Sequence, residues 1–215
     1  MNYSDIAERI VKVTVSPGTA VGLAHGAMSV PLDLGYLALS IFDTSNRRRM
    51  ETERIRLIGA IRSGILNYHQ MIRAIRIIID AFTSYIPKDM QDQVYRDILS
   101  STAGRMLTSG VLAATIANQI IAAGGSAFLS KVATGSVGFA LTSGGLLEHS
   151  IYKSLGLERE NASVYYKLRQ AGNLDFLYFL IKSNMEPFVE ALTVRNRYGE
   201  GEFIKILELL EKNAQ

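Results

Sequence analysis

Apolar residues recur at helical spacing along most of this chain, and no segment alternates apolar and polar residues over the length of a strand. Shorter helices are predicted at 4–13, 89–100, 161–172 and 200–213. A strongly apolar helix is predicted to start at Asn173 and to stop before Pro187. Charges are nearly balanced across 151–215, which is typical of a soluble part. The pattern therefore predicts an all-α protein with one helical domain over residues 1–215.

The most apolar part of the chain lies near its middle. Between Arg105 and Lys131, 25 consecutive residues carry no formal charge, and 16 more uncharged residues precede Glu148. Gly124 and Gly125 mark a turn, so segment 106–147 is predicted to be a helical hairpin. Its first arm would be about 27 Å long at 1.5 Å per residue, close to a hydrocarbon core of roughly 30 Å. We expect a helical bundle around this Gly/Ala-rich hairpin, which would be the most buried part of any water-soluble form.

Small residues spaced four apart define three predicted helix faces. These are Gly18, Gly22 and Gly26 within segment 16–42; Ser109, Ala113 and Ala117; and Ser136, Ala140 and Gly144. This spacing lets helix backbones approach closely, as helices do in lipid. Close packing in a soluble bundle is the more common explanation of any single face, and the three faces together bring a membrane role level with it. Asn118 and Gln119 are costly in hydrocarbon unless they face water or a partner, so they are candidates to line a pore.

Segment 47–86 is predicted to be a basic amphipathic helix, with Gly59 or Gly64 as its candidate break. Eight arginines face three acidic residues up to position 80, and isoleucines recur at helical spacing. Such a helix binds nucleic acid, lies on an anionic membrane, or is a solvated face. Few stacking aromatics interrupt the basic stretch, which argues against nucleic acid. The neighbouring apolar segments favour a membrane surface. The candidate contact residues are Arg54, Arg62 and Arg73, and a solvated face stays open for each of them.

Catalytic chemistry has little support in the sequence. The chain has no cysteine, which excludes disulfides and thiolate metal sites. His25, His69 and His149 are far apart, and no phosphate-binding or nucleophile motif is found. We therefore expect no enzyme activity, no catalytic residue, no metal and no cofactor. His149 is either a polar boundary residue or a pH-sensitive element.

The N-terminal stretch MNYSDIAERIVK is not a secretory signal peptide, because acidic residues precede its first base and no continuous apolar run follows. If the protein leaves the cell, we expect another route of export. The absence of tryptophan argues against permanent residence in a membrane.

Two stretches carry a resemblance to known toxins: PGTAVGLAHGA, and the apolar run ATIANQIIAAGGSAFLSKVATGSVGFALTSGGLLEHS. A helical bundle with an apolar hairpin broken by Gly-Gly is similar to the pore-forming domain of colicins. The small size and glycine zippers resemble the membrane-depolarising effectors of bacterial type VI secretion systems. The resemblance covers about a third of the chain.

The resemblance implies an antibacterial toxin made in the bacterial cytoplasm and secreted without a signal peptide. It would insert in the target inner membrane and dissipate its potential through an ion-conducting pore. Implied partners are the lipid bilayer, a cognate immunity protein, a secretion-system carrier or chaperone, and further copies of the chain in the membrane, but no nucleic acid. Two other classes stay open: a resident membrane protein, such as an immunity protein, and a soluble helical adaptor with no membrane role.

Overall fold

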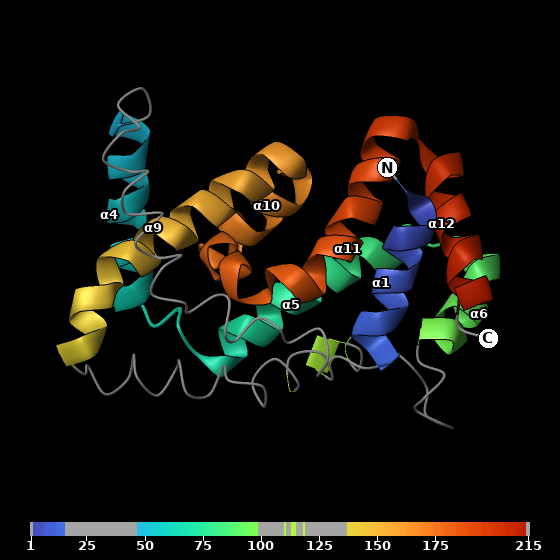
Figure 1. Ribbon diagram of the computed structural model, residues 1–215, viewed down its shortest axis with the longest axis horizontal. Coiled ribbons are helices and arrows are strands. Elements are labelled where there is room, and N and C mark those ends of the chain that lie inside the picture. Colours follow the sequence, from blue (N-terminus) through green and yellow to red (C-terminus); the bar gives the residue numbers. More distant parts are fainter. Residues whose placement is uncertain are drawn as a thin grey trace.

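The computed structural model describes residues 2–15, 47–98 and 137–213, together with positions 110, 113, 114 and 118. All regular elements in these parts are helices (Figure 1), which confirms the predicted all-α class. They are α1 (Tyr3–Val15), α4 (Arg47–Arg62), α5 (Tyr68–Thr83), α6 (Lys88–Ile98), α9 (Val137–Glu160), α10 (Ala162–Gln170), the 3-10 turn η2 (Leu174–Leu177), α11 (Tyr178–Tyr198) and α12 (Glu200–Asn213).

Helix α5 supplies the centre of the core. Its apolar residues recur every three or four positions, so they share one face of the helix, and that face is buried. The Phe82 ring lies edge-on to Phe188 of α11 and Phe203 of α12, with ring centroids 5.3 and 5.5 Å apart. The apolar face of α5 is therefore used inside the protein, and its exposed face carries Arg73 and Arg76.

The other helices pack around this centre. Helix α1 lies against α12 and α11, and Arg9 on α1 joins Glu190 and Glu186 on α11 at 2.9 and 3.2 Å. In Figure 1, α1, α6 and α12 gather at one end of the molecule, while α4 stands at the opposite end. Helix α4 thus lies apart from the packed N- and C-terminal helices.

The basic segment forms two helices, and of the two candidate breaks the chain uses Gly64. Gly64 has φ of +78°, a conformation that favours glycine. Asn67 then caps α5, since its side chain accepts a hydrogen bond from the Gln70 N–H at 3.0 Å. Gly59 lies inside α4. The predicted helices at 4–13, 89–100, 161–172 and 200–213 correspond to α1, α6, α10 and α12.

The prediction that a helix stops before Pro187 is wrong. Helix α11 passes through Pro187, and its predicted first residues form η2 instead. A proline inside a helix costs about 3 kcal/mol, because it lacks the N–H of a backbone hydrogen bond. Pro187 and its neighbours Phe188 and Val189 are buried, and burial of such side chains outweighs that cost.

Replacing Phe82 with alanine should lower the free energy of unfolding by about 3–5 kcal/mol, because it leaves a cavity beside the rings of Phe188 and Phe203. Ile55→Ala on the exposed side of α4 is the matched control, with an expected change within about 0.5 kcal/mol. Urea unfolding measures both. Equal costs would show that Phe82 does not lie at the centre of the core.

Candidate membrane-contact surface

The outer face of α4 combines apolar and basic side chains. It is formed by Arg48, Glu51, Ile55, Ile58 and Arg62, which are spaced three or four residues apart and so share one side of the helix. Ile55 is 69% exposed and Ile58 is 41% exposed, which is unusual for isoleucine. The two isoleucines thus lie between arginines on a face turned away from the core. We call these five residues the α4 outer face.

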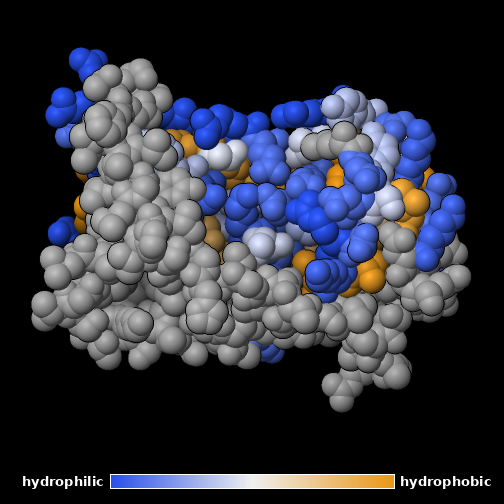
Figure 2. Space-filling model, in the orientation of Figure 1, coloured by the Kyte–Doolittle hydropathy of each residue, from blue (hydrophilic) through white to orange (hydrophobic). Residues whose placement is uncertain are grey.

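Figure 2 shows that the described surface is mainly hydrophilic, with smaller hydrophobic areas between the hydrophilic ones. The opposite side of α4 is buried through Met50, Leu57 and Ala60. Helix α4 is therefore a surface helix with two distinct faces.

A buried ionic network fixes α4 to the rest of the protein, with Arg56 at its centre. The Arg56 guanidinium donates from Nη1 and Nη2 to the two carboxylate oxygens of Asp175, at 2.9 and 2.6 Å. Its Nε donates to Glu53 Oε2 at 2.8 Å, and its Nη1 also donates to Asn173 Oδ1 at 2.8 Å. The guanidinium lies 3.8 Å above the centre of the Phe176 ring. Such bidentate, stacked geometry is specific to arginine.

The carboxylates of this network have further partners. The Ser154 hydroxyl on α9 donates to Asp175 Oδ2 at 2.6 Å, and Arg169 on α10 donates to Glu53 Oε1 at 3.1 Å. Asp175 is fully buried and Glu53 is almost so. Two carboxylates and two guanidinium groups balance in charge, as a buried site requires.

The electrostatics of the network favour the charged form of Arg56. Burial lowers the pKa of Arg56, but its hydrogen bonds and charge interactions with Asp175 and Glu53 outweigh burial and raise that pKa above its ordinary value. The pKa of Arg169 is likewise raised, because hydrogen bonds to Tyr165 and Glu53 outweigh the lowering effect of burial.

Two more arginines of α4 pair with α9. Arg49 forms an ion pair with Glu158, and Arg54 Nε donates to Glu148 Oε1 at 2.5 Å. Glu148 is the first charged residue after the long uncharged stretch, and its side chain is only 4% exposed. Its other oxygen, Oε2, is buried and has no hydrogen-bond partner among the described residues. The end of the uncharged stretch is thus held in the core next to α4.

The candidate contact arginines occupy three different settings. Arg54 is 40% exposed and paired with Glu148. Arg62 is exposed at the end of the α4 outer face, and among the described residues it has no ion pair. Arg73 is exposed on α5, on a face without exposed large apolar residues among those described. Arg54 and Arg62 each lie four residues from the exposed Ile58, but of these two only Arg62 belongs to the α4 outer face and has no ion pair among the described residues.

Few of the predicted zipper and pore residues lie in the described part. Ala113 is buried in the core, and Ala140 and Gly144 lie within α9. Asn118 is exposed, and its Oδ1 accepts a hydrogen bond from the Tyr68 hydroxyl at 2.5 Å. The other predicted residues lie outside the described part: Gly18, Gly22, Gly26, Ser109, Ala117, Gln119, Gly124, Gly125 and Ser136.

Helix α9 spans the predicted boundary between the hairpin (106–147) and the C-terminal part (151–215). It starts at Val137 and continues without interruption to Glu160, so residues 147–151 are mid-helix. Across this point Glu148, His149 and Ser150 are all buried, and the Ser150 hydroxyl donates to the Phe176 carbonyl oxygen at 2.8 Å. A single helix therefore joins the uncharged stretch to the core.

None of the described helices combines the length and the apolar character that crossing a bilayer demands. The same residues contain no group of three or more His, Asp or Glu side chains arranged to hold a metal ion. Protein-family models, curated proteins and solved structures give no match to this chain.

Sequence reasoning missed the ionic network because its members are distant in the chain. Glu53 and Arg56 are three residues apart, and that spacing was the one local signal. Asp175 was hidden inside a segment predicted to be an apolar helix, where a single acidic residue gives no indication of its partner.

Asp175→Asn should lower the free energy of unfolding by about 3 kcal/mol or more, because it removes one partner of a buried ion pair and leaves Arg56 unbalanced. Amide hydrogen exchange in α4 should also accelerate. Asp80→Asn, which breaks the exposed pair with Arg76, is the control and should cost less than about 1 kcal/mol. If the two variants unfold at the same urea concentration, the network does not anchor α4.

Proposed function

We propose that this protein is a membrane-active toxin that binds an anionic bilayer through the α4 outer face and inserts its uncharged segment. The observation that carries the proposal is the pair of exposed isoleucines, Ile55 and Ile58, set between Arg48 and Arg62. Apolar side chains flanked by basic ones are typical of helices that lie in the interface of an anionic membrane.

The energies suit reversible binding at the surface. Each arginine near an anionic leaflet contributes about 1 kcal/mol, a contribution that salt screens. Full burial of an isoleucine contributes about 1.5–3 kcal/mol, and two partly exposed isoleucines gain a fraction of that. Glu51, on the same face, opposes the attraction. The α4 outer face can therefore hold the protein at lipid, but insertion needs the apolar segment 106–147.

The ion pairs between α4 and α9 connect the proposed membrane-binding face to the segment that would insert. Helix α9 carries the end of the uncharged segment, and Arg54 and Arg49 tie it to α4 through Glu148 and Glu158. Docking of α4 would thus bring residues 137–147 close to the bilayer while they remain attached to the core. Small-residue faces such as Gly18, Gly22 and Gly26 would then pack helices together in lipid.

The target, the effect on it and the partners are proposed from the resemblance to colicins and to type VI secretion effectors. The target is the inner membrane of another bacterium, the consequence is loss of membrane potential through a pore, and Asn118 and Gln119 are the candidate pore-lining residues. The producing cell would need an immunity protein, and delivery would need a secretion-system carrier or chaperone. Other copies of the chain could complete the pore.

The double variant Ile55→Ser/Arg62→Gln should weaken binding to vesicles containing phosphatidylglycerol by about tenfold, since it removes apolar area and one charge from the α4 outer face. Arg73→Gln is the matched control, because Arg73 is also exposed but lies apart from the exposed isoleucines. Sedimentation with vesicles at low and at high salt measures both.

If both variants weaken vesicle binding equally, the α4 outer face is not the binding site, and binding depends only on the overall positive charge of the protein. Indifference to vesicles of every composition would favour the soluble adaptor, for which Ile55 and Ile58 would contact a protein partner. Recovery of the protein only with detergent, together with no toxicity, would favour a resident membrane protein.

Gly22→Leu should abolish depolarisation of target cells or of potassium-loaded vesicles, because a large side chain separates the packed helices. Gly201→Leu on α12 is the control: an added Cβ there meets no atom within 4 Å, and depolarisation should persist. Normal activity of Gly22→Leu would exclude the zipper from the mechanism.

A further inference from the structure

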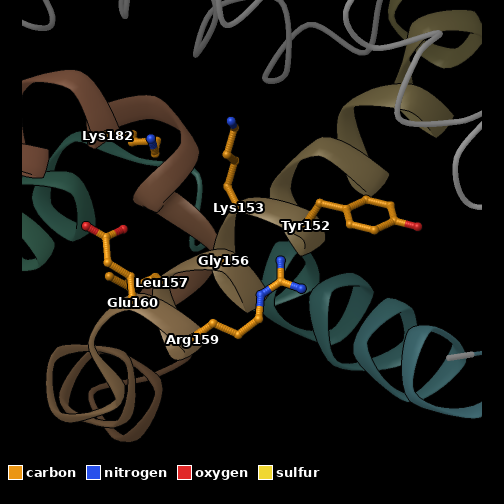
Figure 3. A pocket seen from close by; sticks show the side chains of 7 residues that line it. All are labelled: Tyr152, Lys153, Gly156, Leu157, Arg159, Glu160 and Lys182. Carbon is orange, nitrogen blue, oxygen red and sulfur yellow. The ribbon is translucent and has the colours of Figure 1, made fainter.

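A cavity of about 310 Å³ lies between α9 and α11, and no residue of α4 lines it. Figure 3 shows its lining: Tyr152, Lys153, Gly156 and Arg159 follow one another along α9, and Lys182 comes from α11. Arg159 is exposed and the two lysines are half-buried, so the cavity is open to solvent. No part of the membrane proposal uses it.

Positive charge predominates in this cavity. Lys153, Arg159 and Lys182 line it together with a single carboxylate, that of Glu160. Arg159 is exposed and has no ion pair among the described residues, whereas Lys182 is also paired with Glu186 one turn along α11 and Lys153 has an interaction of its own. A concave site with more cations than anions raises the local concentration of anionic ligands.

Gly156 forms part of the cavity wall, although the fold does not require glycine there. It lies inside α9, where glycine costs about 1 kcal/mol relative to alanine. Its φ is not in the left-handed region, and a Cβ built at this position would meet no atom within 4 Å. Neither the backbone nor packing therefore explains the glycine. Because Gly156 has no side chain, the space between the basic residues stays open.

Glu160 adds a dependence on pH. Burial raises the pKa of Glu160 above its usual range, and the negative charges of Glu186 and Glu190 raise it further, whereas Lys182 and Arg9 act in the opposite direction. Protonation of Glu160 removes the only negative charge that lines the cavity. Binding of an anion whose own charge does not change should therefore strengthen as the pH falls through this pKa.

We propose that the cavity binds a small phosphate monoester, with the phosphate at Lys153 and Lys182. In Figure 3 these two lysine side chains lie at one side of the cavity and the Arg159 guanidinium lies at the other, so Arg159 adds positive charge without contacting the same phosphate. Two ammonium groups suit a dianionic phosphate. The volume admits a headgroup-sized molecule and leaves Gly156 beside the ligand. The monoester is either a soluble metabolite or the headgroup of a lipid such as phosphatidic acid.

The test is a titration of the ¹⁵N-labelled full chain with glycerol 3-phosphate, followed by the amide signals of Lys153, Gly156 and Lys182. Gly156→Leu should fill the cavity and weaken binding at least about tenfold, and Arg159→Gln should weaken it by about three- to tenfold. Glu160→Gln should strengthen binding at neutral pH and should leave only the pH dependence that comes from the second ionisation of the phosphate itself, which has a pKa of about 6. Arg197→Gln, the same charge change near the end of α11, is the control and should have no effect.

A second arm identifies the source of the phosphate. If glycerol 3-phosphate binds as tightly as phosphatidic acid in phosphatidylcholine vesicles, the ligand is a soluble monoester. If only the vesicles bind, and Gly156→Leu abolishes that binding while Ile55→Ser/Arg62→Gln does not, the ligand is a lipid headgroup. Binding that is unchanged in Gly156→Leu, or no binding of either probe by the folded wild-type protein, would overturn the proposal. Neither result depends on whether the protein depolarises membranes.

Discussion

The Arg56 guanidinium holds the separate parts of this protein at one point. Its bonds to Asp175 and Glu53, and its stacking on Phe176, connect α4 with η2. Ser154 and Arg169 extend the connection to α9 and α10. Because buried charges are stable only when fully paired, α4 has one position in which the network is satisfied. Everything proposed for the outer surface of α4 depends on that position.

With its inner face fixed in this way, α4 has an outer face free to meet a partner. The ion pairs of Arg49 and Arg54 with α9 neutralise part of the basic segment within the protein. The positive charge available outside is therefore smaller than the composition of residues 47–86 indicates. What distinguishes α4 from α5 is the exposure of Ile55 and Ile58, since the isoleucines of α5 fill the core. The proposed membrane contact therefore depends on one face of one helix.

The cavity beside Gly156 lies on the same helix that carries the end of the uncharged stretch. Helix α9 thereby connects three features: residues 137–147, the ion pairs with α4, and the basic cavity against α11. The first two belong to the proposed membrane function, and the third is a separate site for a phosphate group. Because the three features use different residues of α9, each one can be tested by substitutions that leave the others intact.

The sequence by itself determined the helical class and most helix positions, because helical periodicity, the Asn67 and Asn161 caps and the glycine breaks are local properties. It also determined the apolar segment 106–147, in which Lys131 is the one charged residue, because this is a matter of composition. Tertiary structure decided that α11 continues through Pro187, since burial of Phe188 outweighs the local cost of proline. It also decided which arginines are paired and which are exposed. Glu148 and Asp175 find their partners 94 and 119 residues away, at separations where no local pattern records contact.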